Sequence, residues 1–232
     1  MRVSDLEKRF DGFTLRIDRL DIGQGQIIGL IGPNGCGKTT AMKLIAGLIR
    51  PNSGAIDYEG LTWRDITMVE RKPYFLHDSV YRNLLYPLSL RKISPDPALV
   101  DYYLEIAGLS DRRRQYAPRL STGEQQKLSL VRAMIFSPKL ILIDEAFSNL
   151  DIESVERFER LILERQNREP VTWIIVSHQL SNIQRLCQRV CFMHNGSIEA
   201  DGKTDEILFH PETPLLRKYL HYATLSDSPE RQ

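Results

Sequence analysis

Cysteine, long apolar runs and net charge are scarce in this sequence, and each scarcity excludes a class of protein. Three cysteines among 232 residues are too few for a disulfide framework, and a reducing cytosol is the simplest environment for them. Cys187 and Cys191 have no His or Cys neighbours, which favours core packing over a metal site. No run approaches the roughly 18 apolar residues that span a bilayer, and residues 1–10 lack the apolar stretch of a signal peptide. A role at a membrane would therefore require a partner.

The charge balance excludes a whole-molecule argument for nucleic-acid binding. The formal net charge is +1, and one short basic run occurs at residues 112–114. No aromatic residues interleave with those arginines, so a solvated loop is the preferred interpretation. The length of 232 residues allows one sizeable core, or one core with a satellite lobe, and we expect one domain with an inserted lobe. The shares of hydrophobic residues, 42%, and charged residues, 26%, are ordinary for a soluble globular protein. We therefore expect no nucleic-acid partner.

Three short runs are apolar on both faces and rich in branched residues: QIIGLIG (26–32), KLILIDE (139–145) and VTWIIVSH (171–178). Strands of this kind lie inside a parallel sheet that helices cover. Helical patterns follow the first two, in TTAMKLIAGLI (39–49) and ESVERFERLILERQ (153–166). This alternation predicts an α/β fold with a mainly parallel sheet.

The remaining segments predict additions to that core. Leu15 and Ile17 alternate with charged residues, which predicts a strand with one solvated face. Residues 73–137 show helical patterns broken by prolines, which predicts a helical lobe inserted into the sheet domain. Residues 195–202 predict a turn and a short strand, residues 214–220 a final helix, and residues 226–232 a frayed tail.

A glycine-rich pattern follows the first apolar run. Its residues satisfy the phosphate-loop pattern, and they are Gly32, Pro33, Asn34, Gly35, Cys36, Gly37, Lys38 and Thr39. Glycines let backbone N–H groups converge on phosphate oxygens, and a helix that starts near Lys38 adds its positive end. Lys38 would reach the β- and γ-phosphates, and the Thr39 hydroxyl would help to hold Mg²⁺. The strand before and the helix after the loop are the context that this mechanism needs.

Polar residues follow the other two apolar runs. Asp144 ends its strand at the edge where such sheets bind ligands, and beside a phosphate loop a metal role is favoured over a helix cap. Glu145 fits either a surface carboxylate or a group that orients an attacking water. His178 alone is more typical of a structural histidine than of a nucleotide contact.

A second motif, LSTGEQ at residues 120–125, combines two properties. Ser121 and Glu124 have the spacing of a capping box at the start of a helix. A helix start that contains Gly123 also presents free N–H groups and a positive dipole end to an anion. Taken alone, the motif favours a helix cap, and a cap does not exclude phosphate binding. A phosphate loop already wraps one face of the nucleotide, and a helical lobe of the same chain is not expected to fold back over the other face.

Taken together, these motifs resemble the ATP-binding-cassette ATPases over nearly the whole chain. The order is GPNGCGKTT, LSTGEQ, LILIDE, SNLD and then His178. The resemblance implies a nucleotide-binding core at residues 1–72 and 138–210 that includes a small antiparallel β subdomain. It also implies a helical subdomain at 73–137 and a C-terminal helix and tail at 211–232, all in a single domain of residues 1–232.

The resemblance assigns roles residue by residue, with ATP and Mg²⁺ as cofactors. It makes Glu145 the residue that polarises water, His178 a γ-phosphate contact and Lys38 a third catalytic residue. Thr39 and Asp144 are the implied metal ligands. The implied nucleotide contacts are Phe10, Gly32, Pro33, Asn34, Gly35, Cys36, Gly37, Lys38, Thr39, Thr40, Ser121, Thr122, Gly123, Glu124 and Asp151. In this family LSTGEQ contacts nucleotide bound by another subunit, so a second copy is the expected partner.

Three positions depart from the family pattern. Thr122 stands where a glycine is usual, and Glu124 replaces the more frequent Gln. Arg71 stands where the family has a Gln that touches Mg²⁺ and the membrane subunit. Arginine has no acceptor and cannot ligate a cation. Either Glu70 takes that metal contact, the loop shifts, or the coupling of hydrolysis to partner motion is altered, and we expect Arg71 to face phosphate or the partner.

The resemblance implies the ATPase subunit of a transporter, located at the cytoplasmic face of the membrane through an integral membrane subunit. A compact chain of this kind resembles bacterial importer subunits, which work with an extracytoplasmic solute-binding protein. Similarity in residues 77–88 and 206–220 suggests a tungstate- or molybdate-type oxyanion. The alternative from another class is a soluble assembly or maintenance ATPase without a membrane partner. A small-molecule kinase would leave LSTGEQ and SNLD unexplained.

Overall fold

The main sheet has six strands, of which only the last runs antiparallel to its neighbour. The computed structural model describes the backbone of residues 1–226 and the side chains of residues 1–223. The strands, in spatial order, are β5 (Ile66–Val69), β6 (Leu140–Asp144), β7 (Thr172–Val176), β3 (Ile27–Ile31), β8 (Arg189–His194) and β9 (Ser197–Lys203). β3, β6 and β7 are the predicted apolar runs, and every residue of each is buried. The predicted α/β fold is confirmed.

A small antiparallel sheet packs against the main one. Its strands lie in the order β2 (Phe13–Asp21), β1 (Arg2–Phe10) and β4 (Ser53–Asp57). The predicted alternation in β2 is present, because Leu15 and Ile17 are buried between exposed neighbours. The sequence pattern did not reveal β4 or β5, since β4 is built of small, mostly exposed residues and β5 is a short edge strand.

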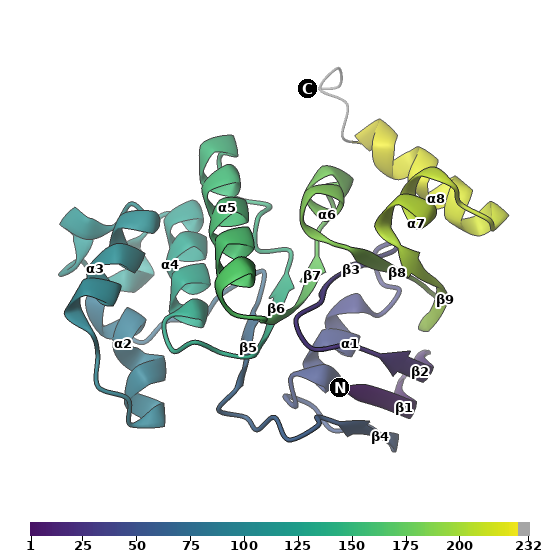
Figure 1. Ribbon diagram of the computed structural model, residues 1–232, viewed down its shortest axis with the longest axis horizontal. Coiled ribbons are helices and arrows are strands. Elements are labelled where there is room, and N and C mark those ends of the chain that lie inside the picture. Colours follow the sequence, from purple (N-terminus) through teal and green to yellow (C-terminus); the bar gives the residue numbers. More distant parts are fainter. Residues whose placement is uncertain (227–232) are drawn as a thin grey trace.

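The buried strands supply two separate cores because alternate side chains point to opposite faces. On one face, Ile141, Ile143 and Trp173 pack with α5 (Ile152–Arg168) and α6 (Leu180–Leu186). On the other face, Leu142 and Ile174 pack with α1 (Lys38–Ile45) and the small sheet. Figure 1 shows α5 and α6 above the sheet and α1 between the two sheets.

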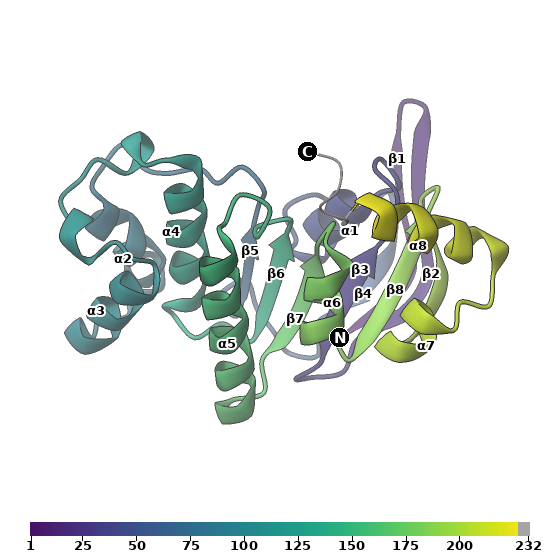
Figure 2. The ribbon, with the colours of Figure 1, turned by 90° about the horizontal axis from the view of Figure 1, so that it is seen from above.

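The insertion between β5 and β6 is helical, as the sequence predicted. It contains α2 (Val80–Arg91), α3 (Pro97–Ile106), α4 (Thr122–Met134) and the short 3-10 turns Ser110–Arg112 and Ala117–Arg119. Figures 1 and 2 show this lobe at one end of the molecule, with α4 next to the sheet and α3 farthest from it. The lobe therefore carries the start of α4, where LSTGEQ lies, at a distance from α1.

The chain ends with two helices beside β8 and β9. They are α7 (Thr204–Phe209) and α8 (Pro214–Ser226), and α8 confirms the predicted final helix. The predicted frayed tail lies outside the described residues except at Ser226. Among residues 1–226, none of the helices combines the length and the apolarity that a membrane span requires.

The apolar stripe of α5 gives a test of this packing. Phe158 is fully buried there, whereas Leu163 on the same helix is 39% exposed. Replacing Phe158 with alanine removes a ring from a close-packed core and should lower the free energy of unfolding by about 3–5 kcal/mol. Leu163→Ala is the matched control and should lose only a small fraction of that amount. Urea unfolding of both variants measures the difference, and equal losses would contradict the assigned packing.

Candidate active site

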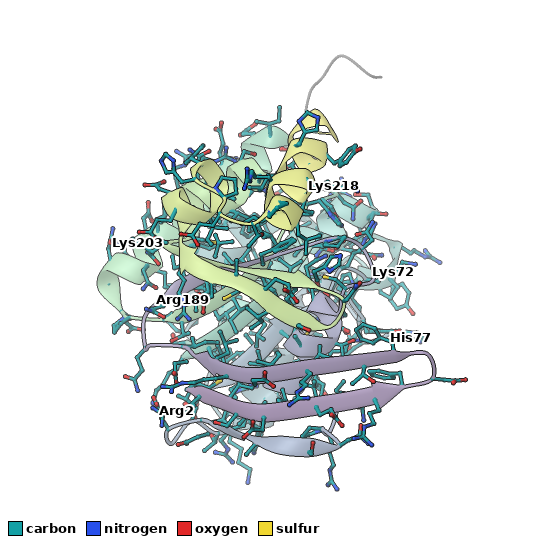
Figure 3. The ribbon with its side chains drawn as sticks, turned by 90° about the vertical axis from the view of Figure 1, so that its right-hand side faces the viewer. Arg2, Lys72, His77, Arg189, Lys203 and Lys218 are labelled. Atoms are coloured by element: carbon teal, nitrogen blue, oxygen red, sulfur yellow. The ribbon has the colours of Figure 1, made fainter. Side chains whose placement is uncertain are left out.

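The predicted site residues lie at one edge of the main sheet. β5, β6, β7 and β3 are adjacent and parallel, so the segments after their last residues meet at the same edge. Figure 3 shows this edge from the side. Arg2 and Arg189, at the starts of β1 and β8, lie opposite Lys72, which follows β5. The sheet therefore brings together segments that are more than a hundred residues apart in the sequence.

The glycine-rich loop after β3 takes a path that side chains would block. Gly32 has φ 148°, and a Cβ there would lie 2.1 Å from the Met193 carbonyl oxygen. Gly35 and Gly37 also have positive φ, of 78° and 112°. Gly37 is the N-cap of α1 and provides no side chain to accept from the first N–H groups of that helix. These donors and the helix dipole suit a phosphate group.

Lys38 is held against this loop. Its Nζ donates to the carbonyl oxygens of Gly32 at 2.7 Å and Pro33 at 3.0 Å, and the residue is only 7% exposed. The loop also contains Asn34 and Cys36. Cys36 is buried, and burial raises the pKa of its thiol, so it is a packing residue in this structure. The ammonium of Lys38 thus lies within the loop that would surround phosphate.

Thr39 and Asp144 come together as predicted for a metal site. The Thr39 hydroxyl donates to Asp144 Oδ2 at 2.7 Å, and Asp144 is 4% exposed. Its other oxygen, Oδ1, is buried and has no hydrogen-bond partner among the described residues. Burial raises the pKa of Asp144, the nearby charge of Glu145 adds to the rise, and the Thr39 hydrogen bond opposes it. A buried carboxylate oxygen that lacks a partner fits a bound cation.

The side chains that could act as ligands indicate which cation would bind here. Within the described residues, no group of three or more His, Cys, Asp or Glu side chains is arranged to hold a metal. Mg²⁺ does not need such a cage, because it binds through one or two protein oxygens together with waters and substrate phosphates. The pair of Thr39 and Asp144 beside a phosphate loop therefore fits Mg²⁺ bound together with a nucleotide.

Glu145 is held between two basic side chains. Its Oε1 lies 2.7 Å from His178 Nε2, and its Oε2 lies 3.1 Å from Arg71 Nη1. Glu145 has an 11% exposed side chain, whereas those of His178 and Arg71 are 44% and 62% exposed. These residues follow β6, β7 and β5, three neighbours in the sheet. Glu145 and His178 therefore lie side by side, and no pattern in the sequence predicted the contact of Glu145 with Arg71.

The backbone also fixes Glu145 in an uncommon conformation. Its φ is 52°, in the left-handed region that costs a non-glycine residue of order 1–3 kcal/mol. Its N–H donates to the Val176 carbonyl oxygen at 3.0 Å, which joins the end of β6 to β7. Its carbonyl oxygen accepts from the Ser148 hydroxyl at 2.9 Å. The turn that carries Glu145 is therefore held by contacts on both sides.

The LSTGEQ segment starts α4 as predicted. Both hydrogen bonds of the capping box are present between Ser121 and Glu124. Thr122 is exposed, so its side chain is accommodated where the family has glycine. At Gly123, in contrast, a Cβ would lie 2.9 Å from the Asn149 carbonyl oxygen. The helix start is thus packed tightly against the SNLD segment.

Two further predicted nucleotide contacts are Asp151 and Phe10. Asp151 caps α5, accepting from the Ser154 N–H at 2.7 Å, and this hydrogen bond is the main cause of the lowered pKa of Asp151. Phe10, at the end of β1, is 47% exposed, and its ring centroid lies 6.4 Å from that of Phe13. An exposed aromatic ring at a strand end is free to stack on a planar ligand.

The chain brings only part of the predicted set together. The glycine-rich loop, Thr39, Asp144, Glu145 and His178 meet at the carboxyl edge of the main sheet. Ser121 to Glu124 begin a helix in the lobe, and Figures 1 and 2 both place β5 and β6 between α4 and α1. Within the described residues, no hydrogen bond or ion pair joins the LSTGEQ segment to the glycine-rich loop.

This arrangement is that of a nucleotide-hydrolysing domain, and comparison with known proteins identifies its family. The family model of the ABC transporter matches residues 15–148, more than half of the chain. The chain belongs to the ABC transporter ATPase family and is an ATP-binding ATPase.

Named relatives differ in what they import. The chain is 35% identical to the tungstate uptake system ATP-binding protein TupC of Peptoclostridium acidaminophilum, over 86% of this chain and 97% of that protein. It is 33% identical to the sulfate/thiosulfate import ATP-binding protein CysA 2 of Rhizobium meliloti, over 98% of this chain but only 66% of that protein. It is also 33% identical to the Fe(3+) ions import ATP-binding protein FbpC of Vibrio cholerae, over 96% of this chain and 67% of that protein.

Solved structures share the fold. An ATP-binding subunit of an ABC transporter matches with a TM-score of 0.83 and 24% identity, over 97% of this chain and 98% of that chain. A dimeric ATP-binding cassette in a post-hydrolysis state, bound to ADP and Pi, matches with a TM-score of 0.77 and 21% identity, over 88% of this chain and 98% of that chain. The predicted cassette fold is thereby confirmed.

The buried carboxylate of Asp144 predicts a pH-dependent stability change. Its pKa is raised in the folded protein, so its contribution to stability is present at low pH and is lost as pH rises from the ordinary carboxyl range through the raised value. An asparagine side chain at this position carries no charge to bury. We therefore expect Asp144→Asn, free of nucleotide and Mg²⁺, to gain stability relative to the parent chain as pH rises from acidic to neutral. Urea unfolding of both proteins at acidic and at neutral pH measures this difference in stability. A variant that is more stable than the parent chain only at acidic pH would contradict the prediction.

Proposed function

We propose that this chain is the ATP-hydrolysing subunit of an importer for a small oxyanion, and that it works as a pair around two ATP molecules. The observation that carries the pairing is the separation of the two phosphate-binding elements. The loop at residues 32–39 lies at the sheet edge, and the helix start at 121–124 lies in the lobe. A second copy, facing the first, would place its helix start over the first copy's loop.

The roles proposed for individual residues follow from their surroundings. Residues 32–37 would bind phosphate through backbone N–H groups, and Lys38 would turn from the loop carbonyls to phosphate oxygens. Thr39 and Asp144 would hold Mg²⁺, which would supply positive charge to the phosphate groups when bound. Thr40 would add a hydroxyl at the first turn of α1, and Phe10 would stack on adenine.

Hydrolysis would depend on Glu145 and His178. Glu145 would orient the attacking water and accept its proton, and its anchored turn holds the carboxylate at the sheet edge. His178 would contact the γ-phosphate while keeping Glu145 in place. Asp151 follows Ser148 and Asn149 beside the start of α4, which places this segment along the proposed seam between copies.

We propose one domain, residues 1–232, with a core at 1–72 and 138–210, a helical subdomain at 73–137 and a C-terminal part at 211–232. Closure of the pair would move an integral membrane subunit, so that the chain sits at the cytoplasmic face of the membrane. An extracytoplasmic solute-binding protein would deliver the substrate. The similarity to TupC over 97% of that protein supports a tungstate- or molybdate-type substrate.

Glu145→Gln tests the proposed pair. Glutamine keeps the size of the side chain but cannot accept the proton, so hydrolysis should slow by roughly 10²- to 10⁴-fold while ATP stays bound. We expect a stable dimer of Glu145→Gln in Mg-ATP, detected by light scattering after gel filtration. Adding Lys38→Ala removes charge-assisted contacts of about 1.5–3 kcal/mol each and should abolish that dimer. A strictly monomeric Glu145→Gln protein at saturating Mg-ATP would refute the pairing.

The proposed importer role is tested with partner proteins. The tagged chain should co-purify with an integral membrane protein. After reconstitution with that protein and its solute-binding protein, tungstate or molybdate should stimulate ATP hydrolysis several-fold, whereas Fe³⁺ and methionine should not. Recovery of soluble partners alone would instead favour an assembly or maintenance ATPase, and stimulation by Fe³⁺ or methionine would overturn the oxyanion assignment.

A further inference from the structure

Arg71 contacts the carboxylate that is proposed to activate water. Its Nη1 lies 3.1 Å from Glu145 Oε2, and this is its only ion pair among the described residues. Glu145 Oε2 is buried and has no hydrogen-bond partner in the described part of the chain, so Arg71 attracts it by charge without a well-aligned hydrogen bond. His178 occupies the other oxygen at 2.7 Å. With both oxygens facing basic groups, the carboxylate has little freedom to turn toward a water molecule.

The loop that carries Arg71 is attached to two helices, α1 and α4. The Glu70 carboxylate pairs with Lys43 Nζ at 3.0 Å, which ties the loop to the last turn of α1. The Glu70 carbonyl oxygen accepts from Gln126 Nε2 at 3.3 Å, which ties it to α4. Gln126 is fully buried, four residues after Thr122 at the helix start. A shift of α4 relative to the sheet would therefore pull directly on the backbone next to Arg71.

We propose that Arg71 is a positioning residue that restrains Glu145, and that Gln126 releases this restraint when α4 moves. This inference rests on the proposed function, in which Glu145 activates water and the start of α4 binds the partner's nucleotide. While α4 keeps the position seen here, Arg71 holds Glu145 and slows ATP turnover. When the start of α4 moves toward the nucleotide bound by the partner copy, the Glu70 backbone follows α4, and Arg71 moves away from Glu145.

The size of the effect follows from the exposure of Arg71. An ion pair with an exposed partner is weak, and its loss should change a rate by a factor of about 2 to 5. Arg71→Gln in the full chain with Mg-ATP should therefore raise kcat by that factor and leave KM for ATP unchanged. Arg71→Lys retains the charge and should keep kcat near the parent value. A fall or no change in kcat for Arg71→Gln would overturn the inference.

A matched control is the neighbouring Lys72, which is exposed and lies at the same edge (Figure 3). Lys72→Gln removes the same charge one residue away and should leave kcat unchanged. An equal rise for Lys72→Gln would mean that net charge, and not the contact with Glu145, controls the rate.

The Glu145→Gln background separates the inference from the proposed function. Adding Arg71→Gln there should give no increase, because no carboxylate remains to be released. If Glu145→Gln hydrolyses ATP at the parent rate, the proposed function fails and the inference with it. If Glu145→Gln is inactive but Arg71→Gln alone leaves kcat unchanged, only the inference fails.

Gln126→Met tests the connection to α4. Methionine has a similar volume but cannot donate to the Glu70 carbonyl oxygen, so motion of α4 no longer reaches the loop. We expect Gln126→Met to lower kcat, because Arg71 stays on Glu145, and the double variant with Arg71→Gln to have the kcat of Arg71→Gln alone. A double variant as slow as Gln126→Met would show that Gln126 does not act through Arg71. Thermal unfolding shows whether Gln126→Met is folded, and the exposed Arg71 variants test the restraint independently of it.

Discussion

The parallel register between β6 and β7 is the constraint on which the active site depends. Asp144 pairs with Val176, and the next N–H, that of Glu145, donates to the Val176 carbonyl oxygen at 3.0 Å. This pairing places Glu145 beside His178, because His178 follows the end of the neighbouring strand β7 by two residues. A slip of one residue would turn every side chain of a strand to the opposite face and would separate the two groups. The apolar residues of both strands, buried on both faces, make such a slip costly.

The site carries several features that oppose folding and suit ligand binding. A carboxylate oxygen of Asp144 is buried without a hydrogen-bond partner among residues 1–223, Glu145 has a left-handed backbone, and three glycines of the loop have positive φ. The surrounding core offsets these costs, because residues on both faces of the sheet are close-packed. Strained backbone and unpaired polar atoms are therefore concentrated at one edge of the sheet. Such features suit a site that binds charged ligands.

The helical lobe makes the site sensitive to events elsewhere in the molecule. Its helix α4 starts with the capped LSTGEQ segment and continues to Gln126, which holds the backbone of Glu70. The same helix start packs on Asn149, whose segment leads from the Glu145 turn to the cap of α5. One helix therefore contacts the segments on either side of Glu145, which gives motion of the lobe a physical route to that carboxylate.

Local pattern in the sequence predicted the buried strands β3, β6 and β7, the phosphate loop, the capping box and the final helix, because each depends on residues that are close along the chain. It also pointed to Asp144, Glu145 and His178, although the resemblance to the family was needed to assign their roles. β4 and β5 escaped notice because small residues and a short edge strand carry little periodic signal. The contact of Arg71 with Glu145 and that of Gln126 with Glu70 were decided by the tertiary structure alone. Both join residues more than fifty positions apart, and only strand order and helix packing bring such residues within reach of each other.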